Sequence, residues 1–152
     1  MKPRLLISVL ALSLLFIMGV YFLTNPSYEK SLRAKYYYEM GDYREAYSLA
    51  KEAFGLDLYN RMAATVMAQS RTSLKYVHYI EDAKKYMLDI DKIAEHENIL
   101  DADRARIKLI CRIMLSSYIK LAPSVITDDK LVEEAAMYHD KFEKLLEKVN
   151  SY

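Results

Sequence analysis

Residues 36–54 read YYYEMGDYREAYSLAKEAF, and this stretch decides the fold of the segment around it. Small alanines and large aromatic residues recur in it every three or four positions, which is the period of an α-helix. The pattern is interrupted at Gly41, a residue type that favours the left-handed backbone conformation found where helices end. Asp42 follows directly and is a residue type that caps the start of a helix. The stretch therefore predicts two helices that are joined by a tight turn.

The helices on either side of this turn have recognisable ends and faces. Asn25 and Pro26 mark the start of the first helix, because asparagine caps helices and proline is favoured in their first turn. This helix should run to about Met40. The second helix has a polar face and an opposite stripe that should be buried. The stripe consists of Tyr43, Ala46, Tyr47, Ala50, Ala53 and Phe54.

The helical period continues through the remainder of the chain. With only three Gly and three Pro, the chain lacks the many turns that an all-β fold needs. The sequence predicts an all-α body of about six antiparallel helices, arranged as three helical hairpins over residues 25–152. The helix over 102–121 is apolar on most sides and should be the most buried, and Pro123 should prevent it from continuing. The other later helices are expected at 59–70, at 74–95 and after a cap at 127–129.

An uncharged apolar stretch from Leu5 to Leu23 precedes this body. As a helix with a rise of ~1.5 Å per residue it would be about 28 Å long, close to the ~30 Å hydrocarbon core of a bilayer. The stretch predicts a transmembrane helix, so that residues 1–24 form an uncleaved membrane anchor. A cleaved signal peptide is the alternative, although no small-residue cleavage pattern is found between Gly19 and Pro26.

Charges next to this stretch predict its orientation. Lys2, Arg4 and the amino terminus give one side more net positive charge than residues 25–39 give the other. In a bacterium this bias keeps the N-terminal side in the cytoplasm. We therefore expect a single-pass protein of the bacterial inner membrane. It would contact the lipid bilayer through residues 5–23 and place residues 25–152 in the periplasm.

The segment from Ser27 to Asn60 resembles a tetratricopeptide repeat, a helix–turn–helix unit of about 34 residues. In that family small residues let the two helices approach closely, and aromatic residues fill the space around them. Lys30 and Leu58 depart from the motif, because the family typically has a large apolar residue and a proline there. The later helix pairs match by helix pairing only, and an unrelated helical bundle is the alternative. The residues that match the motif are Ala34, Tyr37, Gly41, Tyr43, Ala46 and Ala53.

The resemblance implies a partner-binding surface on the first helix of this unit. In tetratricopeptide domains, another protein binds the residues of the first helix that face away from the second. Ser31 and Lys35 stand where co-chaperone repeats use lysine and asparagine to hold a C-terminal carboxylate, so binding of chaperone tails is not expected. Tyr38 has an alternative role, which is packing in the core beside Tyr37. The residues at the partner-binding positions are Tyr28, Ser31, Lys35, Tyr38 and Glu39.

The sequence contains no recognised motif for catalysis, phosphate binding or metal binding. His78, His96 and His139 lie on different predicted helices, and the pair of His139 with Glu143 offers too few ligands for a metal. Cys111 lies among aliphatic residues, where a thiol behaves as a small apolar side chain. A net charge of +1 does not attract nucleic acid. We therefore expect no enzyme activity, no metal, no cofactor, no nucleic-acid partner and no small-molecule substrate.

These features favour a membrane-anchored helical-repeat protein that mediates protein–protein interaction. It would act as an adaptor or as an accessory subunit of a cell-envelope complex. The predicted anchor supplies the location, and the repeat-like hairpin supplies a surface for another protein. The alternative is a permanent structural component of a membrane-spanning secretion or motility machine, whose helices would assemble without leaving a free groove.

Overall fold

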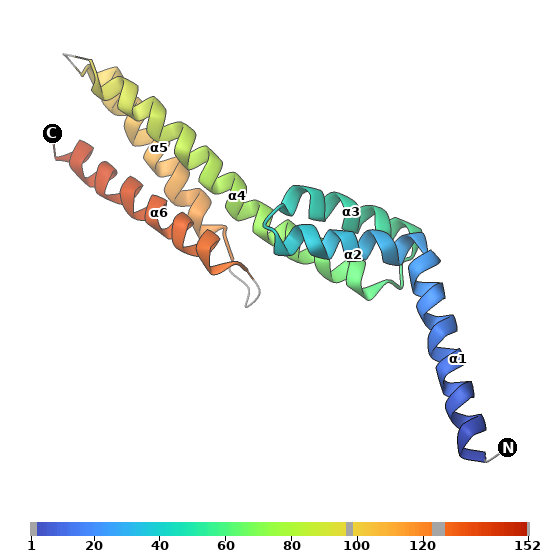
Figure 1. Cartoon of the computed structure of the whole chain (residues 1–152). Helices are drawn as coiled ribbons and strands as arrows, with labels where there is room; N and C mark the ends of the chain where they lie inside the picture. Colours follow the sequence, from blue (N-terminus) through green and yellow to red (C-terminus); the bar gives the residue numbers. More distant parts are fainter. Residues whose placement is uncertain (1–2, 97–98, 123–126, 152) are drawn as a thin grey trace. The chain divides into compact units, whose positions relative to one another are not determined.

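The computed structural model describes residues 3–96, 99–122 and 127–151 of the chain (Figure 1). These residues form six α-helices and no β-strand, which confirms the prediction of an all-α fold. The helices are α1 (Pro3–Thr24), α2 (Pro26–Glu39), α3 (Tyr43–Leu56), α4 (Arg61–Ala94), α5 (Asp101–Ile119) and α6 (Asp129–Asn150).

The chain divides into two compact units, Met1–Arg71 and Thr72–Tyr152. Unit 1 contains α1, α2, α3 and the first part of α4, and unit 2 contains the remainder of α4 together with α5 and α6. The division into an anchor at 1–24 and a body at 25–152 stays a prediction.

Helix α4 is one continuous helix of 34 residues, so the prediction of two helices over 59–70 and 74–95 is wrong. The prediction of three successive hairpins is wrong with it, because five helices follow α1 in the described residues. The residues between the two predicted helices, Arg71 to Ser73, include neither glycine nor proline. They are polar, as loop residues often are, but nothing in their backbone chemistry ends a helix.

Helices α2 and α3 form the hairpin that the sequence predicts. Asn25 caps α2, because its side-chain oxygen accepts a hydrogen bond from Ser27 N at 3.0 Å. Gly41 has a φ angle of +83° and makes the turn between the helices. Asp42 caps α3, since its Oδ1 accepts a hydrogen bond at 3.1 Å from a backbone N–H in the first turn. Both caps and the left-handed turn are therefore confirmed.

Gly41→Ala should destabilise unit 1, whereas Gly55→Ala should stabilise it. An added Cβ atom would meet no other atom within 4 Å at either position, so crowding does not contribute. Alanine at Gly41 must adopt a positive φ angle, at a cost of roughly 1–2 kcal/mol. Gly55 lies within α3, where alanine is favoured over glycine by up to ~1 kcal/mol. Circular dichroism should show melting temperatures that move in opposite directions, and two shifts of the same sign would contradict this account of the turn.

Small residues form the core of unit 1, where α2, α3 and the first part of α4 meet (Figure 1). Ala34 on α2 and Ala46 on α3 are both 0% exposed, which lets the two helix backbones approach closely. Ala53 is also fully buried, so the alanines of the repeat-like motif lie inside the unit. Other members of this core are Leu49, Ala50 and Val66, with Tyr37, Tyr38 and Met67 packed against them.

A buried polar network closes one end of unit 1, where α2 and α4 both begin. Ser27 Oγ donates a hydrogen bond to the carbonyl oxygen of Ala53 at 2.8 Å. Asn60 Nδ2 donates to Ser27 Oγ at 2.9 Å and to Ser31 Oγ at 3.2 Å. Asn60 Oδ1 also caps α4 by accepting a hydrogen bond from Ala63 N at 3.1 Å. Because these three polar side chains are buried, their hydrogen bonds fix the start of α4 against α2.

Unit 2 has a larger core, to which α4, α5 and α6 all contribute. Phe142 on α6 and Cys111 on α5 are both 0% exposed. One face of α6 is buried or half-buried throughout, and it consists of Leu131, Val132, Ala135, Tyr138, Phe142, Leu145, Leu146 and Val149. Asp128 caps this helix, because its Oδ1 accepts a hydrogen bond from Lys130 N at 3.0 Å. The predicted stop at Pro123 lies outside the described residues.

Helix α5 is buried on one face only, which corrects the expectation that residues 102–121 form the most buried helix. Leu109, Ile113 and Ile119 are 59%, 41% and 81% exposed. In a unit of three helices, each helix is covered by its two neighbours on one side. Apolar residues on the outer face of α5 therefore stay exposed, whatever their hydrophobicity.

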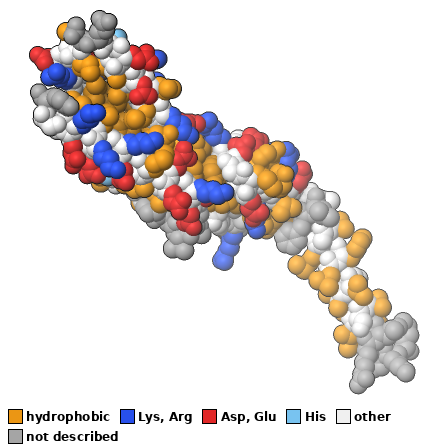
Figure 2. All heavy atoms as spheres, turned by 60° about the vertical axis from the view of Figure 1, so that its left-hand side comes forward, with side chains coloured by type: hydrophobic (Ala, Val, Ile, Leu, Met, Phe, Trp, Pro, Cys, Tyr) orange, Lys and Arg blue, Asp and Glu red, His pale blue; other side chains and the backbone are white. Residues whose placement is uncertain are grey.

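Helix α1 carries exposed apolar side chains, many of which are visible in Figure 2. Leu10 and Phe16, for example, are 62% and 73% exposed. Within the described residues, no single helix meets both the length and the hydropathy expected of a membrane span. Leu6–Tyr21 meets them only when it is taken together with Pro26–Glu39 as a bent pair. The membrane anchor therefore stays a prediction.

Candidate functional site

The five residues predicted to bind a partner lie on α2, but the structure does not bring them to one open surface. Lys35 and Glu39 are exposed and form an ion pair along the helix, with Nζ and Oε1 3.8 Å apart. Tyr28 and Tyr38 are half-buried, and Ser31 is buried. An exposed ion pair of this kind contributes at most about 1 kcal/mol to stability. Lys35 and Glu39 can therefore exchange their mutual contact for contacts with a partner at little cost.

Ser31 is buried in the core of unit 1, so its side chain is not open to a partner in this structure, and its role in partner binding stays a prediction. Its hydroxyl donates a hydrogen bond to the carbonyl oxygen of Tyr28 at 2.9 Å and accepts one from Asn60 Nδ2 at 3.2 Å. Asn60 caps α4, and the start of that helix covers this face of α2. In an isolated hairpin of α2 and α3 the same face would be open, which is why the repeat pattern suggests a groove there.

Tyr38 packs against the core of unit 1, as the alternative for this residue proposes. Its ring centroid lies 5.4 Å from that of Tyr43, with the two ring planes inclined at 69°. Edge-to-face contacts of this kind stabilise packed aromatic pairs. Tyr38 therefore holds the hairpin together, and only the exposed part of its ring is open to a partner.

A row of exposed apolar residues on α2 was not predicted. Leu32, Tyr36 and Met40 are 59%, 57% and 66% exposed. They are spaced by four residues, so they follow one line along the helix surface. We call these three residues the α2 row. In the sequence, the row is recognisable as large apolar residues at every fourth position, on a different side of the helix from the buried Ala34.

The α2 row has the spacing by which one helix binds another. Large apolar anchors about one turn apart recur where an amphipathic helix binds a helix face or a groove. Tyr36 contacts Tyr37, with ring centroids 5.7 Å apart, so this anchor is partly pre-oriented. Lys35 and Glu39 are exposed on the same helix and offer a cation and an anion near the row. These groups suit recognition of an apolar helix that has a polar edge.

A second group of exposed apolar residues lies at the last residue of α3 and in the connection to α4. Leu56, Leu58 and Tyr59 are 58%, 68% and 92% exposed, and we call them the α3–α4 segment. The hydrogen bond from Asn60 Nδ2 to Ser27 Oγ places this segment beside the start of α2. Only one residue separates α2 from α1. The α3–α4 segment therefore lies at the end of unit 1 to which α1 is joined.

One group of side chains in the described part of the chain could hold a metal ion by geometry. His139, Asp140 and Glu143 each offer a ligand atom, and these atoms lie within 4.8 Å of one another. The two carboxylates are exposed and the three residues share one helix, an arrangement that solvated helices also adopt without a metal. The His139 ring lies against Tyr118, with centroids 4.3 Å apart, which gives it a packing role. The absence of a metal and of a cofactor stays a prediction.

Cys111 should react slowly with iodoacetamide at pH 8 while the chain is folded. The thiol is fully buried, and burial raises its pKa to about 11. Because the thiolate is the reactive form, both access and charge state oppose the reaction. Mass spectrometry should find little modification in the native chain and complete modification in urea. Rapid modification of the native chain would contradict the packing of α5.

Comparisons with protein-family models, with curated proteins and with solved structures find no match to this chain. The described residues are helical, and their α2–α3 hairpin has the turn, the caps and the buried alanines of the repeat-like motif. They do not show a series of such hairpins, since α4 runs on as a single helix. The resemblance of residues 27–60 to a tetratricopeptide unit therefore stays a prediction.

Proposed function

We propose that the chain is a single-pass membrane protein that binds another protein through the α2 row. In this role it is an adaptor or an accessory subunit of a cell-envelope complex. The observation that carries the proposal is the exposure of Leu32, Tyr36 and Met40 along one line of α2. The absence of catalytic motifs from the sequence supports a binding role over an enzymatic one.

The proposed anchor is α1. This helix has 22 residues, and at ~1.5 Å per residue its length is about 33 Å, enough to cross the ~30 Å hydrocarbon core of a bilayer. Soluble proteins rarely expose a continuous apolar surface of this kind to water. A bilayer would cover the side chains between Leu6 and Tyr21, which supports the proposal.

The α3–α4 segment gives further support to a membrane location. It lies at the end of unit 1 that is joined to α1, and it exposes two leucines together with Tyr59. Tyrosine is enriched at the membrane–water interface, because its ring is apolar and its hydroxyl is polar. If α1 spans the bilayer, the α3–α4 segment lies close to the lipid head groups.

The partner that suits the α2 row is an apolar helix of another protein. Two turns of α2 present large side chains in a line, and the matching surface is a second helix with apolar residues about one turn apart. Lys35 and Glu39 would meet polar residues at the edge of that helix. The same arrangement suits a soluble amphipathic helix and a helix at the membrane surface.

The test is a pair of double variants of the full chain, purified from solubilised membranes. Leu32→Glu with Met40→Glu places two charges in the α2 row, and it should abolish co-purification of the partner. The matched control is Leu109→Glu with Ile119→Glu, which changes two exposed apolar residues of α5. The control should retain the partner, and both variants should keep the melting temperature of the parent. Retention of the partner by the α2 variant would contradict the proposal.

A permanent structural component of a secretion or motility machine is the second candidate. The exposed apolar residues of α5, Leu109, Ile113 and Ile119, favour it, because a large assembly would cover unit 2 as well as unit 1. A complex that is stoichiometric and resists high salt would support this role. Loss of the complex in the α5 control variant would support it as well.

A further inference from the structure

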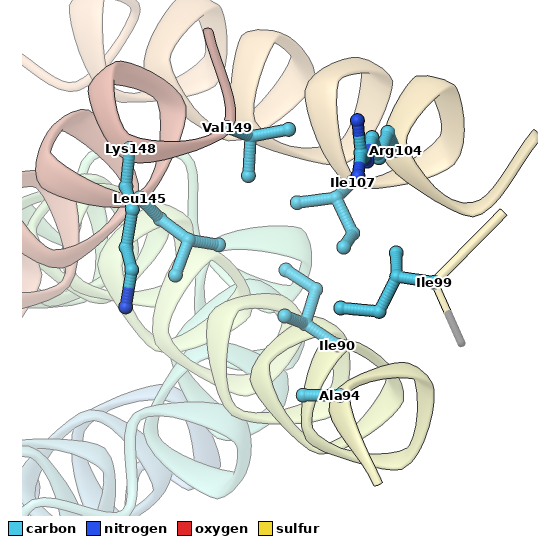
Figure 3. Close-up of a pocket in the computed structure, with 8 residues that line it drawn as sticks. All are labelled: Ile90, Ala94, Ile99, Arg104, Ile107, Leu145, Lys148 and Val149. Carbon is cyan, nitrogen blue, oxygen red and sulfur yellow. The ribbon is translucent and has the colours of Figure 1, made fainter. Parts of the chain in front are cut away.

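Unit 2 contains an apolar pocket between the end of α4 and the facing parts of α5 and α6 (Figure 3). Its volume is about 370 Å³. Ile90 and Ile107 form its deepest part, since they are 4% and 5% exposed. The side chains of Ile99, Leu145 and Val149 surround the opening, and Figure 3 shows them pointing toward a common space.

The lining determines which class of molecule would fit this pocket. The eight residues drawn in Figure 3 include neither an aromatic ring nor a carboxylate. Flat ligands such as nucleobases are usually held by stacking on aromatic rings, and sugars need many hydrogen-bonding partners. A flexible hydrocarbon chain matches a wall of branched aliphatic side chains.

A cation at the pocket adds a charge preference. Arg104 on α5 and Lys148 on α6 both belong to the lining, and Figure 3 shows them on opposite sides of the pocket, with Lys148 extending away from Arg104. In the described part of the chain, neither side chain forms an ion pair. Arg104 is half-buried, so its charge is less screened than that of a fully exposed residue. An anionic group at the mouth of the pocket would therefore gain charge-assisted hydrogen bonds.

We propose that this pocket binds a single-chain aliphatic carboxylate, with the hydrocarbon tail against Ile90 and Ile107 and the carboxylate at Arg104. The pocket volume sets the length of the tail. At ~30 Å³ for each water-sized unit, about 370 Å³ holds roughly a dozen chain atoms. A medium-chain fatty acid fits this description. The proposal does not depend on the membrane anchor or on the α2 row, because every residue that it uses lies in unit 2.

The experiment follows the isoleucine methyl groups of the full chain by NMR in a non-ionic detergent, with decanoate as the probe. Decanoate should shift the methyl signals of Ile90, Ile99 and Ile107 in a saturable way. The signal of Ile80, which is buried elsewhere in the same core, should stay in place. Decyltrimethylammonium has the same tail with a positive head group, and it should bind at least tenfold more weakly than decanoate.

Arg104→Glu should weaken decanoate binding about tenfold or more, because it removes a charge-assisted contact and introduces a repulsive one. Arg106→Glu is the matched control, since it makes the same charge change at an exposed site on α5 that is not part of the lining. The control should bind decanoate like the parent chain. If Arg104→Glu perturbs the fold, Arg104→Gln removes the same charge with a smaller change, and it should also weaken decanoate binding.

Four results would overturn the proposal. The first is the absence of shifts at the three lining isoleucines. The second is an equal response of Ile113 and Ile119, which would mean that decanoate coats the exposed face of α5. The third is equal binding of the cationic probe. The fourth is a dependence of the lining signals on protein concentration without any probe, which would mean that a second copy of the chain fills the pocket.

Discussion

Replacing Leu10 and Leu14 together by arginine is expected to release the chain from membranes. On a translocon-based scale, the Leu, Ile, Val and Phe residues of 5–23 together favour insertion by roughly 4–8 kcal/mol. Two arginines near the centre of the helix oppose insertion by about 5–7 kcal/mol, so the balance becomes close to zero or unfavourable. The measurement is the fraction of the chain that stays in the membrane pellet after alkaline carbonate extraction.

The control for this experiment replaces Leu10 and Leu14 by isoleucine, which keeps the helix apolar. That variant should remain in the pellet, as the parent chain should. A double-arginine variant that is retained as firmly as the parent would contradict the assignment of α1 as the anchor. Release of the parent chain itself would contradict it as well.

Phe142→Ala is expected to give the largest loss of stability among single core substitutions. Phe142 is 0% exposed and lies in the core of unit 2. Truncation of a buried phenylalanine typically costs about 3–5 kcal/mol, because apolar contacts are lost and a cavity remains. In a unit of this size the melting temperature should fall by on the order of 10 °C or more.

Met137→Ala is the matched control for Phe142→Ala. It lies on the same helix, and its side chain is 43% exposed. Its removal should change the melting temperature by no more than a few degrees. Thermal unfolding of the two variants, followed by circular dichroism at equal protein concentration, provides the comparison. Equal losses in the two variants would contradict the packing of α6 against α4 and α5.

The hairpin of α2 and α3 could be predicted from the sequence because local chemistry determines its ends. Asn25 and Asp42 cap their helices through hydrogen bonds to backbone N–H groups within the first turn. Gly41 supplies the positive φ angle of the turn. None of these features depends on a distant part of the chain, so the residue types were sufficient.

The continuity of α4 could not be predicted in the same way. Residues 71–73, where the break between the two predicted helices falls, are polar. Helix continuity depends on the backbone, and this segment has no glycine or proline to end the helix. The spacing of apolar residues predicts which side of a helix is buried. It does not predict at which residue the helix ends.

The candidate site depended on tertiary packing, and the sequence predicted it only in part. Ser31 was assigned to an open face of α2, but the start of α4 covers that face through Asn60. Leu32, Tyr36 and Met40 have the residue types of a core, and they are exposed because no other helix of unit 1 covers them. The position of α4 therefore decides that Ser31 is buried and that the α2 row is exposed. The residues of α2 alone do not specify where α4 lies.

In the proposed function, the α2 row binds a partner protein while α1 holds the chain in the membrane. Photocrosslinking in intact membranes tests both parts in one measurement. A benzophenone amino acid in place of Tyr36 should give a crosslinked product with one partner protein, recovered in the membrane pellet. The same amino acid in place of Ser48, exposed on the polar face of α3, should give no such product. The absence of a product from position 36, or equal products from both positions, would contradict the account.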